Sequence, residues 1–228
     1  TARPARPAKQ VEGATGIIGD VTAAQAVTSF TPAAYYSEIL VSAENLVMGA
    51  ASVEGALPDL FAGSFADAQH FGMMTGDGTM AGLYTNGTLT WDVNCAVPGA
   101  PTWTDFVNFA GALKVRSFNP IIITSPGFIS NLLLSTAASH EGLKMELLTK
   151  GSIRGVPVHE DFYAGTTNAA ADVVAVGMDP KNYVIAMARE LQIEPIRAPG
   201  TAGVYFQATA FFDGGAILAA NGAQLKAV

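Results

Sequence analysis

The residue types that most often bind metals are present in this chain but scattered. The three histidines, His70, His140 and His159, lie far apart, and no Cys-x-x-Cys or His-x-x-x-His pattern occurs. A zinc-type site usually shows its ligands at such short spacings. The densest set of candidate ligands is His159-Glu160-Asp161, which we interpret as the polar end of a strand. We therefore expect no metal site, and no carboxylate pair has the spacing of a glycosidase acid and base.

Two further stretches approach enzymatic motifs without matching them. No Gly-x-Ser-x-Gly elbow occurs, and Cys95 lies in DVNCAVPG without a strand-to-helix context, so we interpret it as a small apolar core residue. The stretch GDGTMAG (76–82) has one residue too many for Gly-x-Gly-x-x-Gly and follows a helical pattern rather than a strand. We interpret it as the loop that ends a helix, and we expect no catalytic residue and no cofactor.

One strand-to-helix turn has the form of places where α/β enzymes bind ligands. The stretch NPIIITSPGFISNLLLST (119–136) predicts a strand over Pro120–Ile123 and a helix that runs to about Ala138. Ser125 suits the cap of this helix, and Pro126 suits its first position. Because local structure accounts for these residues, we expect the turn to be architectural.

The composition favours a chain that meets other copies of itself. Half of the 228 residues are hydrophobic and 14% are charged, whereas soluble domains carry about 25% charged residues. Neighbouring chains could cover such a charge-poor surface. The apolar runs are far shorter than the roughly 18–20 residues of a membrane-spanning helix, so we expect no membrane insertion.

The charge distribution argues against direct, sequence-specific binding of nucleic acid. The formal net charge is −7, and the only basic cluster is Arg3, Arg6 and Lys9. Direct binding of DNA usually needs a basic stripe.

The single cysteine excludes a disulfide within the chain and fits a reducing cytoplasm.

The elements that would position any site begin after an unusual leading segment. Residues 1–34 contain too few large apolar residues to pack a core, so we expect them to become ordered on another subunit. A ribbon in which Thr15–Ile18 pairs with Tyr35–Leu40 is compatible with the pattern, although an isolated hairpin is marginally stable in water.

A long helix is predicted over 58–75, with Pro58 at its first position and Gly76 at its stop. Its apolar stripe comprises Leu57, Phe61, Phe65, Ala68 and Phe71.

Further elements follow from local patterns. Thr102 and Asp105 predict a capping box, followed by a helix that ends near Lys114 and Arg116. The sequence RGVPVHE predicts a short strand. A hairpin is predicted around Asp179-Pro180-Lys181-Asn182, and residues 204–212 alternate as a strand with one core face.

Six motifs in this order resemble the major capsid proteins of tailed bacteriophages, whose shell-forming fold is shared with encapsulins and with the floor domain of herpesvirus capsids. The likeness runs from about Tyr35 to Val228. The motifs are Ser42-x-Glu44, Gly76-Asp-Gly-Thr79, IIITSPGFISNLL, GVPVHED, VGMDPKNYVIAMARELQIEPIR and FFDGGAILAANGAQLKAV.

The resemblance implies an α+β fold and a division of the chain into named parts. These are an N-terminal arm (1–14), an extended β-hairpin loop (15–39), a peripheral domain (40–119) with its spine helix (58–75), an axial domain (120–192), and a return to the peripheral domain (193–228).

The resemblance also implies what the chain binds and where it acts. Copies would form pentamers, hexamers and an icosahedral shell around double-stranded DNA, without sequence-specific contact. Portal and decoration proteins would be further partners. The chain would be a virion component that assembles in the host cytoplasm, after removal of a scaffolding segment ahead of Thr1.

Some relatives cross-link a lysine of the extended loop to a neighbouring asparagine, but residues 15–39 contain no lysine, so that chemistry is not expected here. Two alternatives remain open at this stage. One is an encapsulin-like compartment that encloses enzymes. The other is a small α+β hydrolase or nucleotide-binding enzyme.

Overall fold

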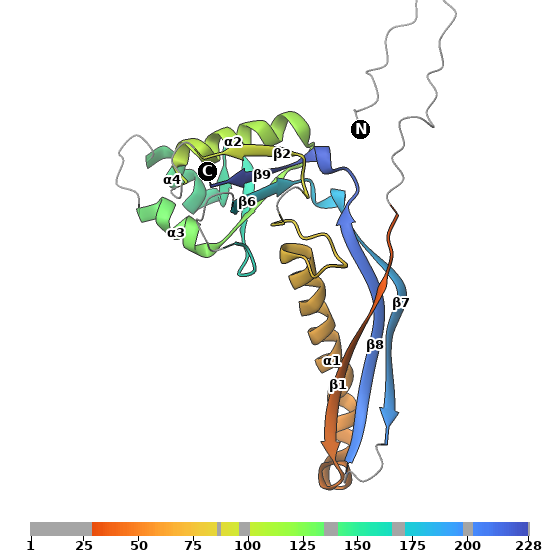
Figure 1. Cartoon of the computed structure of the whole chain (residues 1–228). Helices are drawn as coiled ribbons and strands as arrows, with labels where there is room; N and C mark the ends of the chain where they lie inside the picture. Colours follow the sequence, from red (N-terminus) through yellow and green to blue (C-terminus); the bar gives the residue numbers. More distant parts are fainter. Residues whose placement is uncertain are drawn as a thin grey trace, which may run out of the picture.

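The computed structural model describes residues 29–85, 88–95, 101–134, 141–165, 172–197 and 203–227, with backbone alone over 43–54. These residues form a compact lobe around one sheet and a long arm in which a helix lies beside a second sheet (Figure 1). The arm leaves the lobe at an angle, so the molecule has the outline of an elbow.

The lobe is built on a six-stranded sheet with helices packed on it. The strand order is β2-β9-β6-β3-β5-β4. The pairs β2/β9 and β3/β5 are parallel, and the others are antiparallel. The strands are β2 (Trp91–Asn94), β3 (Ile121–Thr124), β4 (Ser152–Ile153), β5 (Val156–Glu160), β6 (Val173–Met178) and β9 (Gly222–Lys226); the helices are α2 (Trp103–Arg116), α3 (Pro126–Leu134) and α4 (Glu141–Lys150).

The core of the lobe forms because α2 presents large apolar side chains to the sheet. Trp103, Phe106, Phe109 and Leu113 are buried on one side of this helix, together with Ile122 of β3. The Nε1 group of Trp103 donates a hydrogen bond of 2.9 Å to the carbonyl of Leu132. This bond satisfies the indole polar group inside the core.

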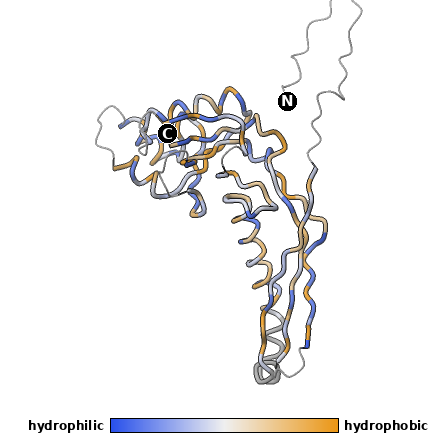
Figure 2. Tube along the Cα trace, viewed as in Figure 1, coloured by the Kyte–Doolittle hydropathy of each residue, from blue (hydrophilic) through white to orange (hydrophobic). Residues whose placement is uncertain are grey.

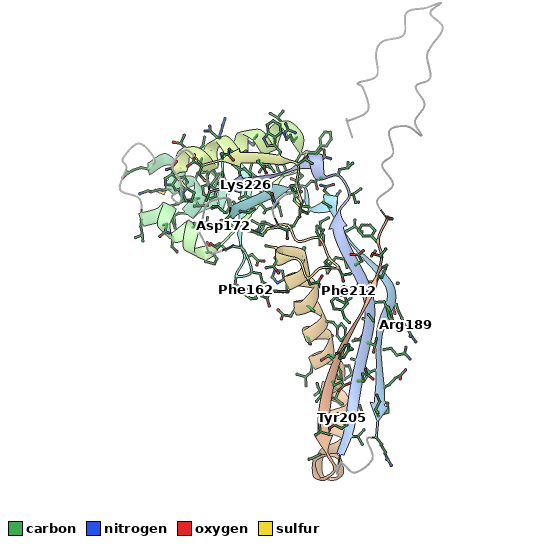
Figure 3. All side chains as sticks on the ribbon, in the orientation of Figure 1. Phe162, Asp172, Arg189, Tyr205, Phe212 and Lys226 are labelled. Carbon is green, nitrogen blue, oxygen red and sulfur yellow. The ribbon has the colours of Figure 1, made fainter. Side chains whose placement is uncertain are left out.

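The long arm consists of α1 (Ala43–Thr75) and a three-stranded antiparallel sheet. The strand order is β1-β8-β7, with bounds Ala33–Ser42, Gly203–Ala216 and Tyr183–Ile196. One face of this sheet packs on α1, where Phe61, Phe65 and Phe212 are buried together. Phe212 also stacks on Tyr35, with ring centroids 3.9 Å apart. Figure 3 shows Phe212 on the strand beside α1.

The helix α1 begins 15 residues earlier than the pattern predicted, at Ala43 rather than Pro58. Residues 43–57 include four Ala, two Glu, two Leu and one Met, all of which favour helix. Pro58 lies inside the helix on its exposed side, where water can satisfy the carbonyl that a proline leaves without a donor. The predicted end is confirmed, because Gly76 follows Thr75 with a φ of +78°, which glycine adopts without strain.

The apolar stripe of α1 is correct except at its last member. Leu57, Phe61 and Phe65 are buried, whereas Phe71 is 43% exposed and packs edge-on against the ring of Tyr163. The position facing the core near the helix end is Met74 instead.

The predicted hairpin around Asp179–Asn182 is wrong. These residues do form a tight turn, in which the Asp179 side chain accepts a hydrogen bond from the Lys181 N–H. However, the strands on either side enter different sheets: β6 pairs with β3 and β9, and β7 pairs with β8. The turn therefore joins the lobe to the long arm. Turn chemistry constrains the turn itself, while pairing depends on partners far away in the sequence.

Other local predictions are confirmed. The capping box at Thr102 and Asp105 is present, and Lys114 and Arg116 occupy the last turn of α2. The helix α3 begins at Pro126, with the predicted end at Ala138 outside the described residues. Along β8, Ala208, Ala210 and Phe212 form the buried face, as the alternation predicted.

The two structural units do not divide the chain at residues 119/120 and 192/193, where the resemblance placed the domain boundaries. The helix α2 and strands β2 and β9 belong to the same sheet unit as β3, β5 and β6, while all of β7 lies in the long arm. Tyr35–Leu40 lies in β1 and pairs with Tyr205–Ala210. Its expected partner, Thr15–Ile18, lies outside the described residues.

Candidate assembly surfaces

The residue types that suggested chemistry are distributed as parts of the framework. Within the described ranges, no group of three or more His, Cys, Asp and Glu side chains could hold a metal ion. Cys95 is buried in the core of the lobe. Burial, together with the nearby Asp105 carboxylate, raises the pKa of its thiol to about 11. A thiol with this pKa is a poor nucleophile at neutral pH. His140 lies outside the described residues.

The Gly76–Thr79 loop ends α1 and ties it to β1. The Asp77 carboxylate accepts hydrogen bonds from the N–H groups of Thr79 and Met80, at 2.9 and 2.8 Å, and from the Tyr35 hydroxyl. Burial by itself would raise the pKa of Asp77, but these hydrogen bonds hold it below its ordinary value. Burial and the hydrogen bond to Asp77 raise the pKa of Tyr35 to about 12.

The glycines of this loop permit close backbone contact. A Cβ atom on Gly82 would lie 2.2 Å from the Gly76 nitrogen, so no larger residue fits without moving the backbone. The interpretation of this loop as a helix terminator is therefore supported by the geometry of the loop itself.

The strand-to-helix turn at Ser125 is filled by its own chain. Thr124 and Ser125 are buried, and the Thr124 hydroxyl donates a hydrogen bond of 3.0 Å to the Val174 carbonyl. The Ser125 carbonyl accepts from the N–H groups of Phe128 and Ile129. These contacts support an architectural turn.

The segment after β5 contacts α1 at the junction between the lobe and the long arm; these contacts are called the brace. Asp161 hydrogen-bonds to His70 of α1, with Oδ2 and Nε2 2.5 Å apart. The Tyr163 hydroxyl donates a hydrogen bond of 2.7 Å to Asp67, one helical turn away. The rings of Phe162 and Tyr163 lie edge-on to His70. Figure 3 shows Phe162 in this segment, beside α1.

Sequence reasoning missed this brace. It treated Asp161 as part of the polar end of a strand, and it gave His70 no role. The two residues are 91 positions apart, so no local pattern connects them. The nearest available signal was the density of polar and aromatic residues in HEDFY (159–163).

The outer face of the three-stranded sheet is the first candidate assembly surface. The strand register gives it three cross-strand rows: Tyr36, Thr209 and Gln192; Glu38, Gln207 and Glu194; and Leu40, Tyr205 and Ile196. Tyr36 is 72% exposed and Leu40 is 54% exposed. In Figure 2 hydrophobic residues recur along these strands, and Figure 3 shows Tyr205 toward the far end of the arm.

Exposed apolar side chains also gather on the lobe. Leu134, Met145 and Leu148 project from α3 and α4, and Val115 and Phe118 from the end of α2 and the loop after it. Phe118 is 93% exposed. Where such side chains form a contiguous patch, the patch usually meets a partner, so these positions are candidates for contact with another subunit. None of the helices in the described ranges is long and apolar enough to span a membrane.

Comparisons with known proteins agree with this arrangement. A family model described as the phage capsid family matches residues 4–222. The search of curated proteins found no match.

Solved structures with a similar fold include shells of two kinds. The capsid of a native GTA particle has a TM-score of 0.72 at 19% identity, covering 86% of this chain and 72% of that chain. A protein of Mycobacterium phage Che8 has a TM-score of 0.61 at 15% identity, covering 93% and 80%. The SrpI encapsulin complex from Synechococcus elongatus PCC 7942 has a TM-score of 0.61 at 14% identity, covering 86% and 74%. These likenesses extend over both the lobe and the long arm.

Proposed function

The chain belongs to the phage capsid family, and from this premise we propose that its copies form pentamers and hexamers that close into an icosahedral shell around double-stranded DNA. It is a structural capsid subunit with the α+β fold of phage capsid proteins. The shell geometry and the DNA content are the parts that require experiment.

The observation that carries the proposal is the outer face of the three-stranded sheet. One face of this sheet is covered by α1, while the other exposes Tyr36 and Leu40 to solvent. A sheet of three strands with only one covered face leaves apolar area that a neighbouring subunit can bury. In a closed shell every copy would have such a neighbour, and many weak contacts would add together.

The two structural units support distinct roles in the shell. We assign the axial role to the lobe and the peripheral role to the long arm with the spine helix α1. Exposed apolar side chains on α3 and α4, including Met145 and Leu148, would then meet their counterparts around the capsomer axis. The peripheral arms would form the contacts between capsomers. Residues 1–14 keep their proposed role as arm, and the proposed extended loop shortens to residues 15–32, because Ala33–Ser42 forms β1 of the long arm.

DNA, portal and decoration proteins are proposed partners. The acidic net charge of −7 supports loose contact between the shell wall and DNA, because like charges repel. We propose a virion location, assembly in the host cytoplasm and no enzymatic role. The buried Cys95, whose pKa is raised, and the self-satisfied turn at Ser125 support that last proposal.

The experiment is to express the chain, separate the product by size and image it by cryo-electron microscopy. Closed particles with five-fold vertices are expected. A monomer that stays monodisperse over a range of protein concentration, salt and pH would contradict the proposal.

An encapsulin-like compartment is the second candidate, and the likeness to the SrpI encapsulin complex favours keeping it. Particles from the native source distinguish the two. Nuclease-protected double-stranded DNA supports a viral shell, while an enclosed enzyme with no DNA supports a compartment.

A further inference from the structure

A groove lies where α1 ends beside β8. One cavity of about 360 Å³ extends from Ser29 to Asp213 and Gly214. A second cavity of about 440 Å³ lies along the loop after α1. Thr79, Ala81 and Thr88 line both, so the two cavities adjoin, and together they are called the groove. Each cavity has a size usual for a binding site.

The walls of this groove suit an extended peptide. Most lining residues are glycine, alanine or threonine, so backbone groups and hydroxyls are within reach of an occupant. Extended segments bind through such backbone contacts, with selectivity added by a few side chains.

Two carboxylates lie at the groove, those of the buried Asp213 and the exposed Asp77. Asp213 is the one ionisable residue that lines it within the described part of the chain, and the exposed Asp77 lies between two lining glycines. The Asp213 carboxylate accepts hydrogen bonds of 2.7 Å from the N–H groups of Thr31 and Gly214. The pKa of the neighbouring Tyr183 is raised. Burial has the largest effect, and the carboxylates of Asp213 and Asp77 add to it. This field would attract a cationic occupant.

The chain itself contains a segment with the complementary properties. Residues 3–9, RPARPAK, carry three positive charges and no negative charge. Their two prolines favour an extended conformation and reduce the entropy lost on binding.

We propose that the groove binds residues 3–9 of a neighbouring copy of the chain. Twenty peptide steps separate Lys9 from Ser29, and they can extend about 66 Å. Ser29 of the same chain lines the groove, so binding within one chain would require these residues to double back. The same length would let these residues reach the identical groove of an adjacent subunit that lies within about 66 Å. The inference rests on the proposed function, since it needs adjacent copies.

The test is disulfide trapping between two different variants. Ala5→Cys and Ala81→Cys chains are co-expressed, particles are isolated, and mild oxidation is followed by a non-reducing gel. Ala81 is exposed and lines both cavities. A dimer that contains one chain of each variant is expected. The native Cys95 is buried, so it should not contribute.

Two controls make the result specific. Ala62→Cys, exposed on α1 away from the groove, replaces Ala81→Cys and should give at least tenfold less dimer. The triple change Arg3→Gln, Arg6→Gln and Lys9→Gln in the Ala5→Cys chain should reduce the dimer several-fold and make the remainder more sensitive to salt.

The outcomes separate the two proposals. Particles that form normally but give no mixed dimer overturn the groove assignment and leave the shell function intact. Equal trapping at Ala62 and Ala81 also overturns it, as does a disulfide formed only within a doubly substituted Ala5→Cys/Ala81→Cys chain. If no particles form under any condition, the proposed function itself fails.

Discussion

The Nε2 atom of His70 lies 2.5 Å from the Oδ2 atom of Asp161, and this contact joins the long helix α1 to the sheet lobe. A second contact crosses the same junction, from the Tyr163 hydroxyl to Asp67. Each side of the junction thus contributes one carboxylate. Asp67 lies on α1, three residues before His70, and Asp161 lies after β5, two residues before Tyr163. The pair of contacts limits rotation of the lobe about the arm.

We expect Asp161→Asn to lower the free energy of unfolding by about 1–2 kcal/mol, because the partly buried His70 loses a charged partner. Chemical denaturation of the unassembled chain would measure the change in the free energy of unfolding. Glu160→Gln, an exposed neighbour in the sequence, is the matched control and should change stability by less than about 0.5 kcal/mol. Equal effects of the two changes would contradict the bracing role.

Thr102→Ala removes the side chain that caps α2 and should destabilise the lobe by about 1 kcal/mol. Thr102→Ser keeps the hydroxyl and should preserve most of the stability. Thermal denaturation of the three proteins tests this order. A Thr102→Ala protein as stable as the parent would show that the capping box contributes little here.

Stability should fall as the pH rises through the alkaline range. The pKa of Tyr35 is raised from 10.0 to about 12, so the folded state favours the protonated phenol. Its contribution is fully present below pH 10.0 and is lost as the pH approaches 12. Cys95, raised from 9.0 to about 11, acts in the same direction at slightly lower pH.

The variants Tyr35→Phe and Cys95→Ala separate these two contributions. Each variant should have a shallower loss of stability in its own pH interval, whatever its stability at pH 7. Denaturant melts at half-unit steps between pH 8 and 12 would measure the slopes. An unchanged slope in both variants would mean that other groups cause the alkaline loss.

Leu40→Glu should block shell assembly while the chain remains folded. Leu40 is exposed on the outer face of the three-stranded sheet, so a charge there costs little in the free chain. In a packed interface the same charge would lose its water without gaining a partner. Circular dichroism would report folding and electron microscopy would report assembly.

Asn108→Glu, an exposed polar position on α2, is the control for added charge and should still assemble. Normal particles from Leu40→Glu would show that the outer face of the three-stranded sheet is not an assembly surface.

Removal of residues 1–28 should leave a folded body that forms unstable shells or none. The cut must fall before Ser29, because the Thr31 N–H binds Asp213 and β1 begins at Ala33. The leading residues lack a core of their own, so they gain stability only on other subunits. Size-exclusion chromatography and electron microscopy of the truncated chain provide the measurement, and normal assembly would refute the role assigned to this segment.

Features that depend on residues close together in the chain could be predicted without the fold. The capping box at Thr102, the end of α1 at Gly76 and the alternation along β8 all follow from side chains and backbone within a few positions. The low charge indicated contact with other copies, and the resemblance of six ordered motifs to phage capsid proteins indicated a capsid subunit. These signals are local or compositional, so they survive without knowledge of the fold.

The contacts between distant segments became known from the folded chain. It placed β6 and β7 in different sheets although one short turn joins them, and it paired β1 with β8 across the length of the chain. It also brought His70 to Asp161 and showed α1 continuing through Pro58. Strand pairing and packing gain their free energy from contacts between residues far apart in sequence, and local propensity carries no information about those partners.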